Sequence, residues 1–327
     1  NKNFKYILLN NNSHDSVGGQ NTHANNINFE KLSKSLGFKK FYSIESDKNL
    51  KKNIQNFLKV NNLGFLEVKV SNSKIKKLPR PTDLIKIKKS MPPKVSIVLP
   101  VRNEEKFLKE CLKSIQRQTL SLWELIVVDD HSTDDSNQIL ESFSKRDNRI
   151  RIFKNPGNGI SDCLNFGIYI AKSPLIARMD GDDLMESKRL EIQVDHLNKN
   201  NKVGLVASQV EPFPKAITNH RKGYELYVEW TNEILTAEEH SMNRFVDCPF
   251  AHPSIIFRKS LIDCYGGYAK GILPEDFELW LRWMGHGVVM EKLPQVLLKW
   301  RDHPKRASRT NLGYTPSAFQ KVKAKHF

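Results

Sequence analysis

Short apolar segments alternate with helix-like segments between residues 95 and 179, and this alternation limits the fold more than any other feature. VSIVLP (95–100), ELIVVDD (124–130), IRIF (150–153) and LIARM (175–179) are rich in strand-favouring residues. The segments that separate them show the helical recurrence of apolar residues. Strands that alternate with helices of this length predict an α/β fold, with a mostly parallel sheet and helices on both faces.

A helix is predicted directly after the first of these strands. Asn103 is expected to cap it, and Glu104 and Glu105 would then lie at its positive end. Apolar residues from Phe107 to Ile115 recur with the spacing that buries one face of a helix.

Composition changes near residue 90, where prolines cluster in KKLPRPTDLIKIKKSMPPKVSIVLP. Proline favours extended, non-helical backbone, which predicts a linker at 79–93. It would separate an N-terminal domain (1–78) from a larger domain (94–310) and a C-terminal tail (311–327). The chain begins with Asn rather than Met, and the tail reads as a helix with nothing to pack on. We therefore expect both ends to be cut.

The positive charge is concentrated before the second domain. Residues 1–93 carry 18 Lys and Arg against 6 Asp and Glu, and so hold +12 of the total net charge of +16. No nucleic-acid recognition motif accompanies this charge, so no specific nucleic-acid partner is expected. A weak attraction to anionic surfaces, such as peripheral association with a membrane, is compatible with it.

Two predicted strands end in acidic residues. Asp129 and Asp130 follow ELIVV, and Asp180, Asp182 and Asp183 follow LIARM. Ligands of open α/β sheets bind beyond the carboxyl ends of the strands, and Mg²⁺ and Mn²⁺ prefer carboxylate oxygens. The acids therefore indicate either a divalent-cation site or a solvated polar turn, and residue type alone does not separate these alternatives.

Cysteine usage and hydropathy limit the compartment. Cys111, Cys163, Cys248 and Cys264 are irregularly spaced, which is typical of buried thiols in a reducing compartment rather than of disulfides or a zinc site. No apolar run approaches the roughly 18 residues that span a bilayer. The expected location is the cytoplasm, either free or at the inner face of the membrane.

Several motifs in the second domain resemble those of glycosyltransferase family 2. They are KVSIVLPVRNEE, WELIVVDDHSTDDS, LIARMDGDD, CPFAHPSIIFRKS, LPEDFELWLRW and WRDHPKRAS, in this order over about 94–310. The resemblance implies the GT-A fold, a Rossmann-like nucleotide-diphospho-sugar transferase sheet with flanking helices. It also implies transfer of a hexosyl or N-acetylhexosaminyl group from a nucleotide-sugar, UDP-sugar being favoured, to a glycan or lipid-linked acceptor.

The same resemblance implies roles for individual residues. In the nucleotide-sugar site it places Pro100, Val101, Arg102, Glu104, Asp130 and Asp182, with Asp130 accepting a hydrogen bond from the base. A metal ion, Mn²⁺ or Mg²⁺, would bind Asp183 and Asp182, which resemble the DxD pair, together with His303. Asp180 would support this pair. His303 can equally be structural, and His252 is either structural or part of the acceptor site. Arg306 and Arg309 are candidates for phosphate contacts.

The motif LPEDFELWLRW would supply the catalytic base. Pro274 suits a first helical turn, which places Glu275 and Asp276 at the positive end of that helix. The resemblance implies that Asp276 is the general base of an inverting, single-displacement transfer, with Glu275 beside it. The alternative is that both acids only complement the helix dipole. Trp280 and Trp283 would either pack in the core or shape an acceptor pocket.

The first ninety residues resemble a different family. FKYILLNNNSHDSVGGQNTHANNINFEKLSKSLGFKK, with GFLEVKV and LPRPTDL, is similar to the C-terminal end of phosphonopyruvate decarboxylase, a thiamine-diphosphate enzyme. Asn11 would be a vestigial ligand of its diphosphate and Mg²⁺ site. The Gly-Asp-Gly half of that motif is absent, so thiamine diphosphate is not expected to bind. A lyase fused to the transferase and a non-catalytic binding module are the alternative interpretations of the chain.

Overall fold

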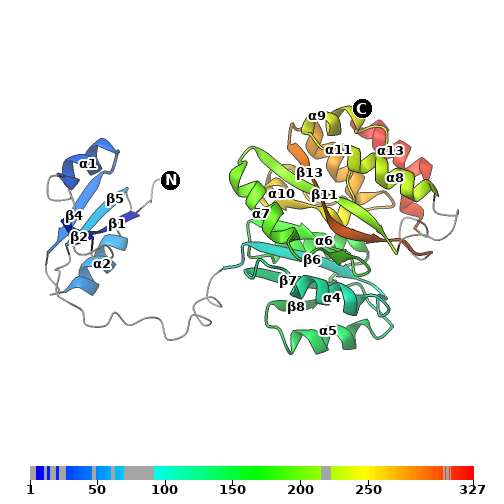
Figure 1. The fold of residues 1–327 in the computed structure, drawn as a ribbon, viewed down its shortest axis with the longest axis horizontal. Helices are drawn as coiled ribbons and strands as arrows, with labels where there is room; N and C mark the ends of the chain where they lie inside the picture. Colours follow the sequence, from blue (N-terminus) through cyan, green and yellow to red (C-terminus); the bar gives the residue numbers. More distant parts are fainter. Residues whose placement is uncertain are drawn as a thin grey trace. The chain divides into compact units, whose positions relative to one another are not determined.

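The structure is a computed structural model that describes residues 5–10, 13–14, 20–21, 27–45, 49–59, 63–69, 92–214, 222–304, 306, 309 and 311–327. The chain divides into two compact units, Asn1–Thr82 and Asp83–Phe327 (Figure 1). This division falls inside the segment 79–93, most of which lies outside the described residues. No helix in the described part is long and apolar enough to cross a bilayer.

The first unit is a small α/β unit. Its parallel sheet has the order β1-β5-β4, formed by Lys5–Asn10, Gly64–Lys69 and Lys40–Ile44. Its helices are α1 (Phe29–Ser35) and α2 (Leu50–Leu58). The short strands β2 (Ser13–His14) and β3 (Gln20–Asn21) pair antiparallel in a separate two-stranded sheet. A core of Ile44, Phe57, Leu66 and Val68 joins α2 to the sheet. Asn11, the predicted vestigial ligand, lies outside the described residues.

The second unit is built on an eight-stranded sheet of order β10-β13-β11-β12-β9-β6-β7-β8. Four neighbouring pairs are parallel and three are antiparallel, the latter involving β10 and β12. The strands are β6 (Val95–Val101), β7 (Trp123–Asp129), β8 (Ile150–Lys154), β9 (Leu175–Arg178), β10 (Leu184–Met185), β11 (Val203–Phe213), β12 (Ile256–Arg258) and β13 (Val289–Arg301). The predicted mostly parallel sheet is thereby confirmed.

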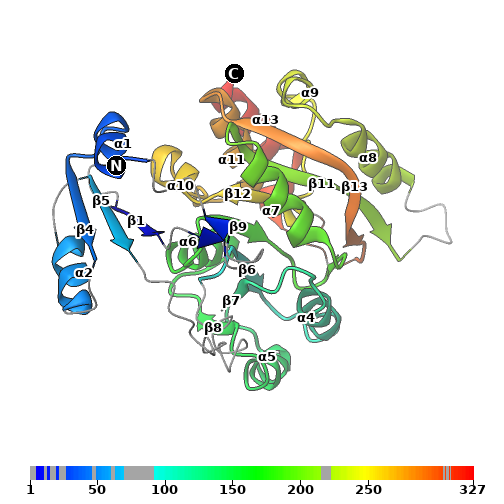
Figure 2. The same cartoon turned by 60° about the vertical axis from the view of Figure 1, so that its left-hand side comes forward.

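Helices cover both faces of this sheet. They are α4 (Leu108–Gln116), α5 (Ser136–Ser144), α6 (Ile160–Tyr169), α7 (Arg189–Lys199), α8 (Lys222–Glu233), α9 (Ala237–Asn243), α10 (Ser260–Tyr265), α11 (Glu275–Gly285) and α13 (Pro316–His326). Single-turn helices lie at His252–Ser254 and Leu312–Tyr314. One core collects apolar residues of α4, α5 and α7, and the other those of α6 and α11. Figure 2 shows these helices around the sheet.

Asn103 does not cap the helix after the first strand, contrary to our prediction. The helix α4 begins only at Leu108, and Asn103 has a positive φ of 56°. Its side-chain oxygen instead accepts a hydrogen bond from the backbone N–H of Thr133 at 2.8 Å. Asn103 therefore joins the loop after β6 to the loop after β7, because a short polar side chain tolerates this backbone and can reach the neighbouring loop.

The tail 311–327 belongs to the second unit, so the expectation that it has nothing to pack on is wrong. Ala318 and Val322 of α13 are buried, and the ring of Phe319 lies 5.4 Å from that of Phe277 on α11. Lys325 and His326 contact the buried carboxylate of Glu278 at 2.9 and 3.2 Å. The tail is therefore held by apolar packing and by ion pairs.

Removal of the Glu278 carboxylate is expected to destabilise the unit strongly. Burial raises the pKa of Glu278, but hydrogen bonds from Arg282 and Lys325 outweigh it and bring the pKa to about 2. We expect Glu278→Ala to lower the free energy of unfolding by about 3 kcal/mol, because it leaves Arg282 without its carboxylate. The wild-type contribution is present above pH 4.5 and is lost as the pH falls through about 2.

Urea unfolding at pH 7 measures this effect. Glu141→Gln is the control, because Glu141 forms an exposed pair with Lys145 at 3.7 Å and should contribute less than about 0.5 kcal/mol. Equal midpoints for the two variants would contradict the stabilising role of Glu278.

Candidate functional site

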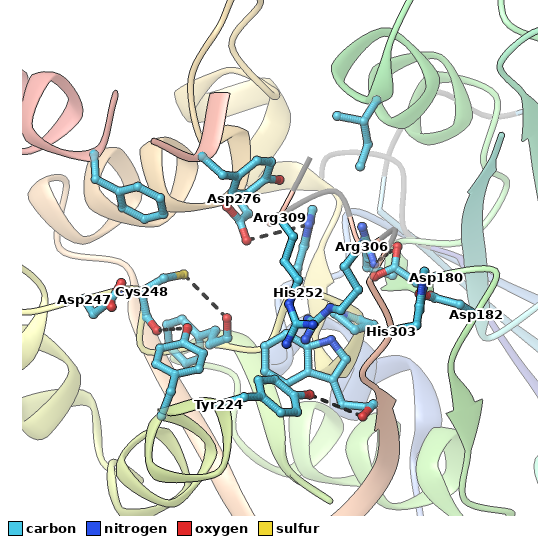
Figure 3. A pocket seen from close by; sticks show the side chains of 18 of the residues that line it. Asp180, Asp182, Tyr224, Asp247, Cys248, His252, Asp276, His303, Arg306 and Arg309 are labelled. Carbon is cyan, nitrogen blue, oxygen red and sulfur yellow. Dashed lines mark hydrogen bonds and ion pairs between the residues drawn. The ribbon is translucent and has the colours of Figure 1, made fainter. Parts of the chain in front are cut away.

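A cavity of about 420 Å³ lies where the loop after β9, the start of α11 and the segment after β13 meet. Figure 3 shows the acids Asp180 and Asp182 facing it from one side and Asp276 from another. The lining also includes Glu104, His303, Arg306 and Arg309 and several aromatic side chains, among them Tyr224 and Tyr227 of α8 and Trp300 of β13. Residues far apart in the sequence, from Glu104 to Phe319, therefore form one site.

The acidic cluster after β9 has the composition and spacing of a cation site. Asp180, Asp182 and Asp183 each offer an oxygen, and these oxygens lie within 4.8 Å of one another. Asp183 is buried, and its Oδ2 atom has no hydrogen-bond partner among the described residues. Burial, and after it the charges of Asp182 and Asp180, raises the pKa of Asp183 well above its usual value. A divalent cation would satisfy the Oδ2 atom and offset this repulsion.

Arg301, at the end of β13, holds this cluster in place. Its backbone N–H donates to Asp183 Oδ1 at 2.7 Å, and its Nε donates to the carbonyl oxygen of Asp182 at 2.5 Å. Its guanidinium also pairs with Glu110 at 2.7 Å. Sequence analysis did not identify Arg301, because the 118 residues that separate it from Asp183 give no local signal.

Arg178 is a second residue that sequence analysis missed. It is buried on β9 and forms an ion pair with Asp180. A charged residue inside the apolar segment LIARM is the signal that could have revealed it, since a buried guanidinium requires a partner. Asp180 therefore has Arg178 as its ion-pair partner, and its supporting role in the metal site stays a prediction.

His303 reaches the cavity but is not a member of the three-carboxylate cluster. Its Nε2 atom lies 2.8 Å from Asp182 Oδ2, and its ring lies 5.2 Å from that of Phe107. This arrangement makes His303 a partner of Asp182. The role of His303 as a ligand beside Asp182 and Asp183 stays a prediction.

Glu104 lines the cavity beside the acidic loop, close to Gly181, and is half-buried. Burial, and after it the charges of Asp182 and Asp180, raises the pKa of Glu104 to about 8. Its neutral form is therefore favoured at neutral pH in the absence of a cation. Of the residues predicted to bind the nucleotide-sugar, Glu104 and Asp182 line this cavity.

Pro100, Val101, Arg102 and Asp130 lie together at the ends of β6 and β7, next to the cavity lining rather than in it. The N–H of Asp130 donates to the carbonyl oxygen of Val101 at 2.7 Å. The carboxylate of Asp130 accepts hydrogen bonds from Asn155 at 2.6 Å and from the N–H of Gly159 at 3.0 Å, and Arg102 lies 3.3 Å away. Asp130 thus fixes the start of α6 and keeps one carboxylate edge near the exposed Arg102.

The two acids at the start of α11 occupy different environments. Asp276 lines the cavity, whereas Glu275 is buried beneath it and accepts a hydrogen bond from the hydroxyl of Tyr314 at 2.8 Å. Burial raises the pKa of Asp276 to about 6, and burial together with Asp276 raises that of Glu275 to about 8. At pH 7 the arrangement favours an ionised Asp276 beside a neutral Glu275, which is a suitable state for a general base.

His252 lies between this acid pair and Tyr268. Its Nε2 atom is 2.8 Å from the Tyr268 hydroxyl, and its Nδ1 atom is 3.9 Å from Asp276 Oδ2. Burial, and after it the charge of Arg178, lowers the pKa of His252 well below its usual value. His252 is therefore neutral and helps to close the floor of the cavity. Trp280 and Trp283 are fully buried in the core and do not line it.

An aromatic wall with two arginines forms the remaining side of the cavity. Tyr224 and Tyr227 of α8 donate hydrogen bonds to the carbonyl oxygens of Trp300 and Cys248, at 3.2 and 2.8 Å. The guanidinium of Arg306 stacks on the rings of Tyr224 and Trp300, at 4.8 and 4.5 Å from their centroids. Figure 3 shows Arg306 and Arg309 between this wall and the acids. Sequence analysis predicted the arginines but not the tyrosines.

Comparison with known proteins agrees with this geometry. The model of the family described as glycosyl transferase family 2 matches residues 96–266. A UDP-Gal:alpha-D-GlcNAc-diphosphoundecaprenol beta-1,3-galactosyltransferase of Escherichia coli is 31% identical over 237 residues, which cover 72% of this chain and 82% of that protein. The putative glycosyltransferase EpsE of Bacillus subtilis is 30% identical over 228 residues, which cover 68% of this chain and 78% of that protein.

Solved structures share the fold. The S. aureus TarS fragment 1–349 in complex with UDP-GlcNAc has a TM-score of 0.56 at 16% identity, covering 70% of this chain and 64% of that one. The mannosyltransferase PcManGT from Pyrobaculum calidifontis, in complex with GDP-Man and Mn²⁺, has a TM-score of 0.50 at 20% identity. The match covers 72% of this chain and 62% of that one. The α/β fold is thus GT-A-like, and the chain belongs to glycosyltransferase family 2.

Proposed function

We propose that this glycosyltransferase is metal-dependent and inverting, and that it transfers a sugar from a UDP-sugar to a glycan or lipid-linked acceptor. The observation that carries the proposal is that Asp182 and Asp276, from two distant elements, line one cavity. An inverting transfer needs two functions in one site, namely stabilisation of the leaving diphosphate and a base for the acceptor. We propose that Asp182 serves the first of these functions and Asp276 the second.

The donor would bind on the side of β6, β7 and β9. Asp130 would accept a hydrogen bond from the base, because a carboxylate suits the imide N–H of uracil. Asp182 and Asp183 would hold Mn²⁺ or Mg²⁺, with Asp180 in support, and His303 would orient Asp182. The cation supplies neutralisation of the diphosphate charge. Arg306 and Arg309 would offer guanidinium groups to phosphate oxygens from the opposite side.

Asp276 would act as the base in a single displacement. The acceptor hydroxyl oxygen forms a bond to the anomeric carbon while the bond from that carbon to the diphosphate breaks. The hydroxyl proton passes to Asp276, and the electron pair leaves with the nucleoside diphosphate. Glu275, held by Tyr314, would position Asp276 rather than take the proton itself.

The aromatic wall would receive the acceptor. Tyr224, Tyr227 and Trp300 offer apolar faces with polar edges, which suit the stacking of a sugar ring. The name of the Escherichia coli relative describes an acceptor sugar on a lipid diphosphate. By analogy we propose an acceptor sugar carried by a lipid diphosphate, used by an enzyme on the cytoplasmic side of a membrane.

A panel of nucleotide-sugars tests this proposal directly. Release of UDP is followed with each sugar nucleotide, with and without Mn²⁺, in the presence of a GlcNAc-diphospholipid acceptor. We expect turnover with at least one UDP-sugar, and a fall of at least about tenfold after chelation of the metal. Undiminished turnover in chelator would contradict metal dependence, and turnover only with GDP-sugars would contradict the choice of UDP.

The resemblance of the first unit to phosphonopyruvate decarboxylase remains a prediction. The matched family region begins at residue 96, so it does not reach this unit. The parallel sheet β1-β5-β4 is compatible with a piece of a larger α/β domain. We propose no decarboxylase activity for this chain, because the residues present lack half of the thiamine-diphosphate motif.

A further inference from the structure

The surface formed by α9 and α13 combines exposed apolar side chains with basic ones. We define the α9–α13 face by Met242, Arg244 and Val246 from the end of α9 and its following loop, and by Lys321 and Lys323 of α13. Met242 and Val246 are 69% and 60% exposed, although large apolar side chains are usually buried. Lys321 is exposed as well. Figures 1 and 2 both show α9 and α13 together at one end of the second unit.

Direct contacts make the face continuous. The Nζ atom of Lys323 donates to the carbonyl oxygen of Val246 at 2.8 Å, and the ring of Phe245 lies 5.6 Å from that of Phe327. Inward-facing Ala318 and Val322 anchor α13, so its outward face is free to carry charge. The apolar and basic groups are therefore held on one supported surface.

The charge of this face has one dominant sign. The segment Pro316–His326 contains no acidic residue, and of its three lysines Lys321 and Lys323 belong to the face, whereas Lys325 pairs with Glu278 of α11. On α9 the acids Glu238 and Glu239 lie in the first turn, at the end opposite Met242, and Glu239 is committed to the cap of that helix. The outer face of α8 carries the exposed acids Glu229 and Glu233 and is therefore not part of the proposed surface.

The α9–α13 face also borders the functional cavity. Asp247 and Cys248, which follow Val246 directly, line that cavity, and so do Tyr314 and Phe319 at the start of the C-terminal segment. A surface that rested on a membrane here would bring the aromatic wall close to the lipid headgroups. Basic side chains interspersed with exposed apolar ones are the combination that binds to an anionic interface.

We propose that the α9–α13 face docks on an anionic lipid bilayer and presents the cavity to membrane-borne acceptors. Met242 and Val246 would enter the headgroup region, while Arg244, Lys321 and Lys323 would pair with anionic headgroups. This inference rests on the proposed lipid-linked acceptor. It is nevertheless tested by binding alone, so its failure can be distinguished from a failure of the proposed transfer reaction.

Co-sedimentation of the full chain with vesicles provides the test. Vesicles of phosphatidylcholine are compared with vesicles that contain phosphatidylglycerol, and the variant Met242→Ser/Lys321→Gln is compared with wild type. We expect wild type to bind only the anionic vesicles, and the variant to partition about tenfold more weakly. The matched control is Tyr169→Ser/Lys145→Gln, which removes one exposed apolar side chain and one exposed lysine elsewhere and should bind like wild type.

The outcomes are decisive in both directions. Equal binding by both double variants would overturn the proposal, and it is the result expected if the basic first unit alone attracted the vesicles. Failure of wild type to bind would overturn it too. A concentration-dependent dimer that is lost in Met242→Ser/Lys321→Gln, without vesicle binding, would assign the face to a second copy of the chain instead. Turnover of a water-soluble acceptor should be equal in all three proteins.

Discussion

Replacement of Asp276 by Asn is expected to lower the turnover number by about 10² to 10⁴, with little change in donor affinity. Asn keeps the shape of the side chain and can still accept the hydrogen bond that Phe277 N–H gives to Asp276 Oδ1 at 2.7 Å. It cannot take the proton of an acceptor hydroxyl. Steady-state transfer kinetics measure the loss, and titration with UDP-sugar measures the affinity.

The pH profile provides an independent check on this assignment. Because the pKa of Asp276 is about 6, turnover of wild type should fall about tenfold per pH unit below 6 and level off above it. Asp276→Asn should lack this dependence. The control is Glu275→Gln, which should lose less than about tenfold because Glu275 lies beneath the cavity on Tyr314. A larger loss in Glu275→Gln than in Asp276→Asn would transfer the role of base to Glu275.

The same substitution should stabilise the fold at alkaline pH. The pKa of Asp276 is higher in the folded protein than the usual 3.8, so ionisation of this group costs stability as the pH rises from about 4 through 6. We expect Asp276→Asn to raise the free energy of unfolding at pH 8 by about 1–3 kcal/mol, with no gain at pH 3. A gain in stability with a loss of turnover is typical of a functional site.

Asp183→Asn is expected to abolish the response of the protein to Mn²⁺. Asp183 Oδ2 is buried and has no hydrogen-bond partner in the described part of the chain, whereas Oδ1 accepts from Arg301 N–H at 2.7 Å. The side-chain oxygen of Asn can still accept the hydrogen bond from Arg301 N–H, but Asn lacks the negative charge that binds a cation. We expect kcat/KM to fall by about 10² to 10⁴, since a bound metal contributes several kcal/mol to such reactions.

A thermal shift experiment separates metal binding from catalysis. Wild type should gain stability when Mn²⁺ is added, because a ligand that binds only the folded state stabilises it. Asp183→Asn should unfold at a similar temperature with and without Mn²⁺. Asp195→Asn is the matched control, since Asp195 forms an exposed pair with Lys199 at 2.7 Å. A wild-type shift in Asp183→Asn would rule out Asp183 as a ligand.

Local patterns predicted much of the fold. The strands β6 to β9 and the helices between them follow from apolar runs and helical periodicity, and these patterns need only neighbouring residues. A proline and two acids likewise predicted the helix α11, which begins at Glu275, one residue after the predicted Pro274. The failures concern long-range contacts. The polar side chain of Asn103 indicated a helix N-cap, but it accepts a hydrogen bond from Thr133, thirty residues away in the sequence.

The same distinction applies to the site. The acids at 180–183 and at 276 stand in local motifs, so the sequence identified them and the structure brings Asp182 and Asp276 to one cavity. Arg301, Tyr314 and Tyr224 act through partners more than 35 residues away, and no periodicity records such pairings. The sequence predicts no packing partners for the tail that contains Tyr314. Its frequent lysines indicate an exposed segment, although Ala318 and Val322 are buried.

The cavity lining extends from Glu104 to Phe319, and this has a consequence for biosynthesis. A nascent chain can form β6, β7 and the acidic loop early, since domains begin to fold as they are made. It cannot close the cavity until α13 has left the ribosome, because Tyr314 and Phe319 are the last residues of the cavity lining. Chains shorter than this would therefore lack the complete cavity lining, so the site is finished only near the end of synthesis.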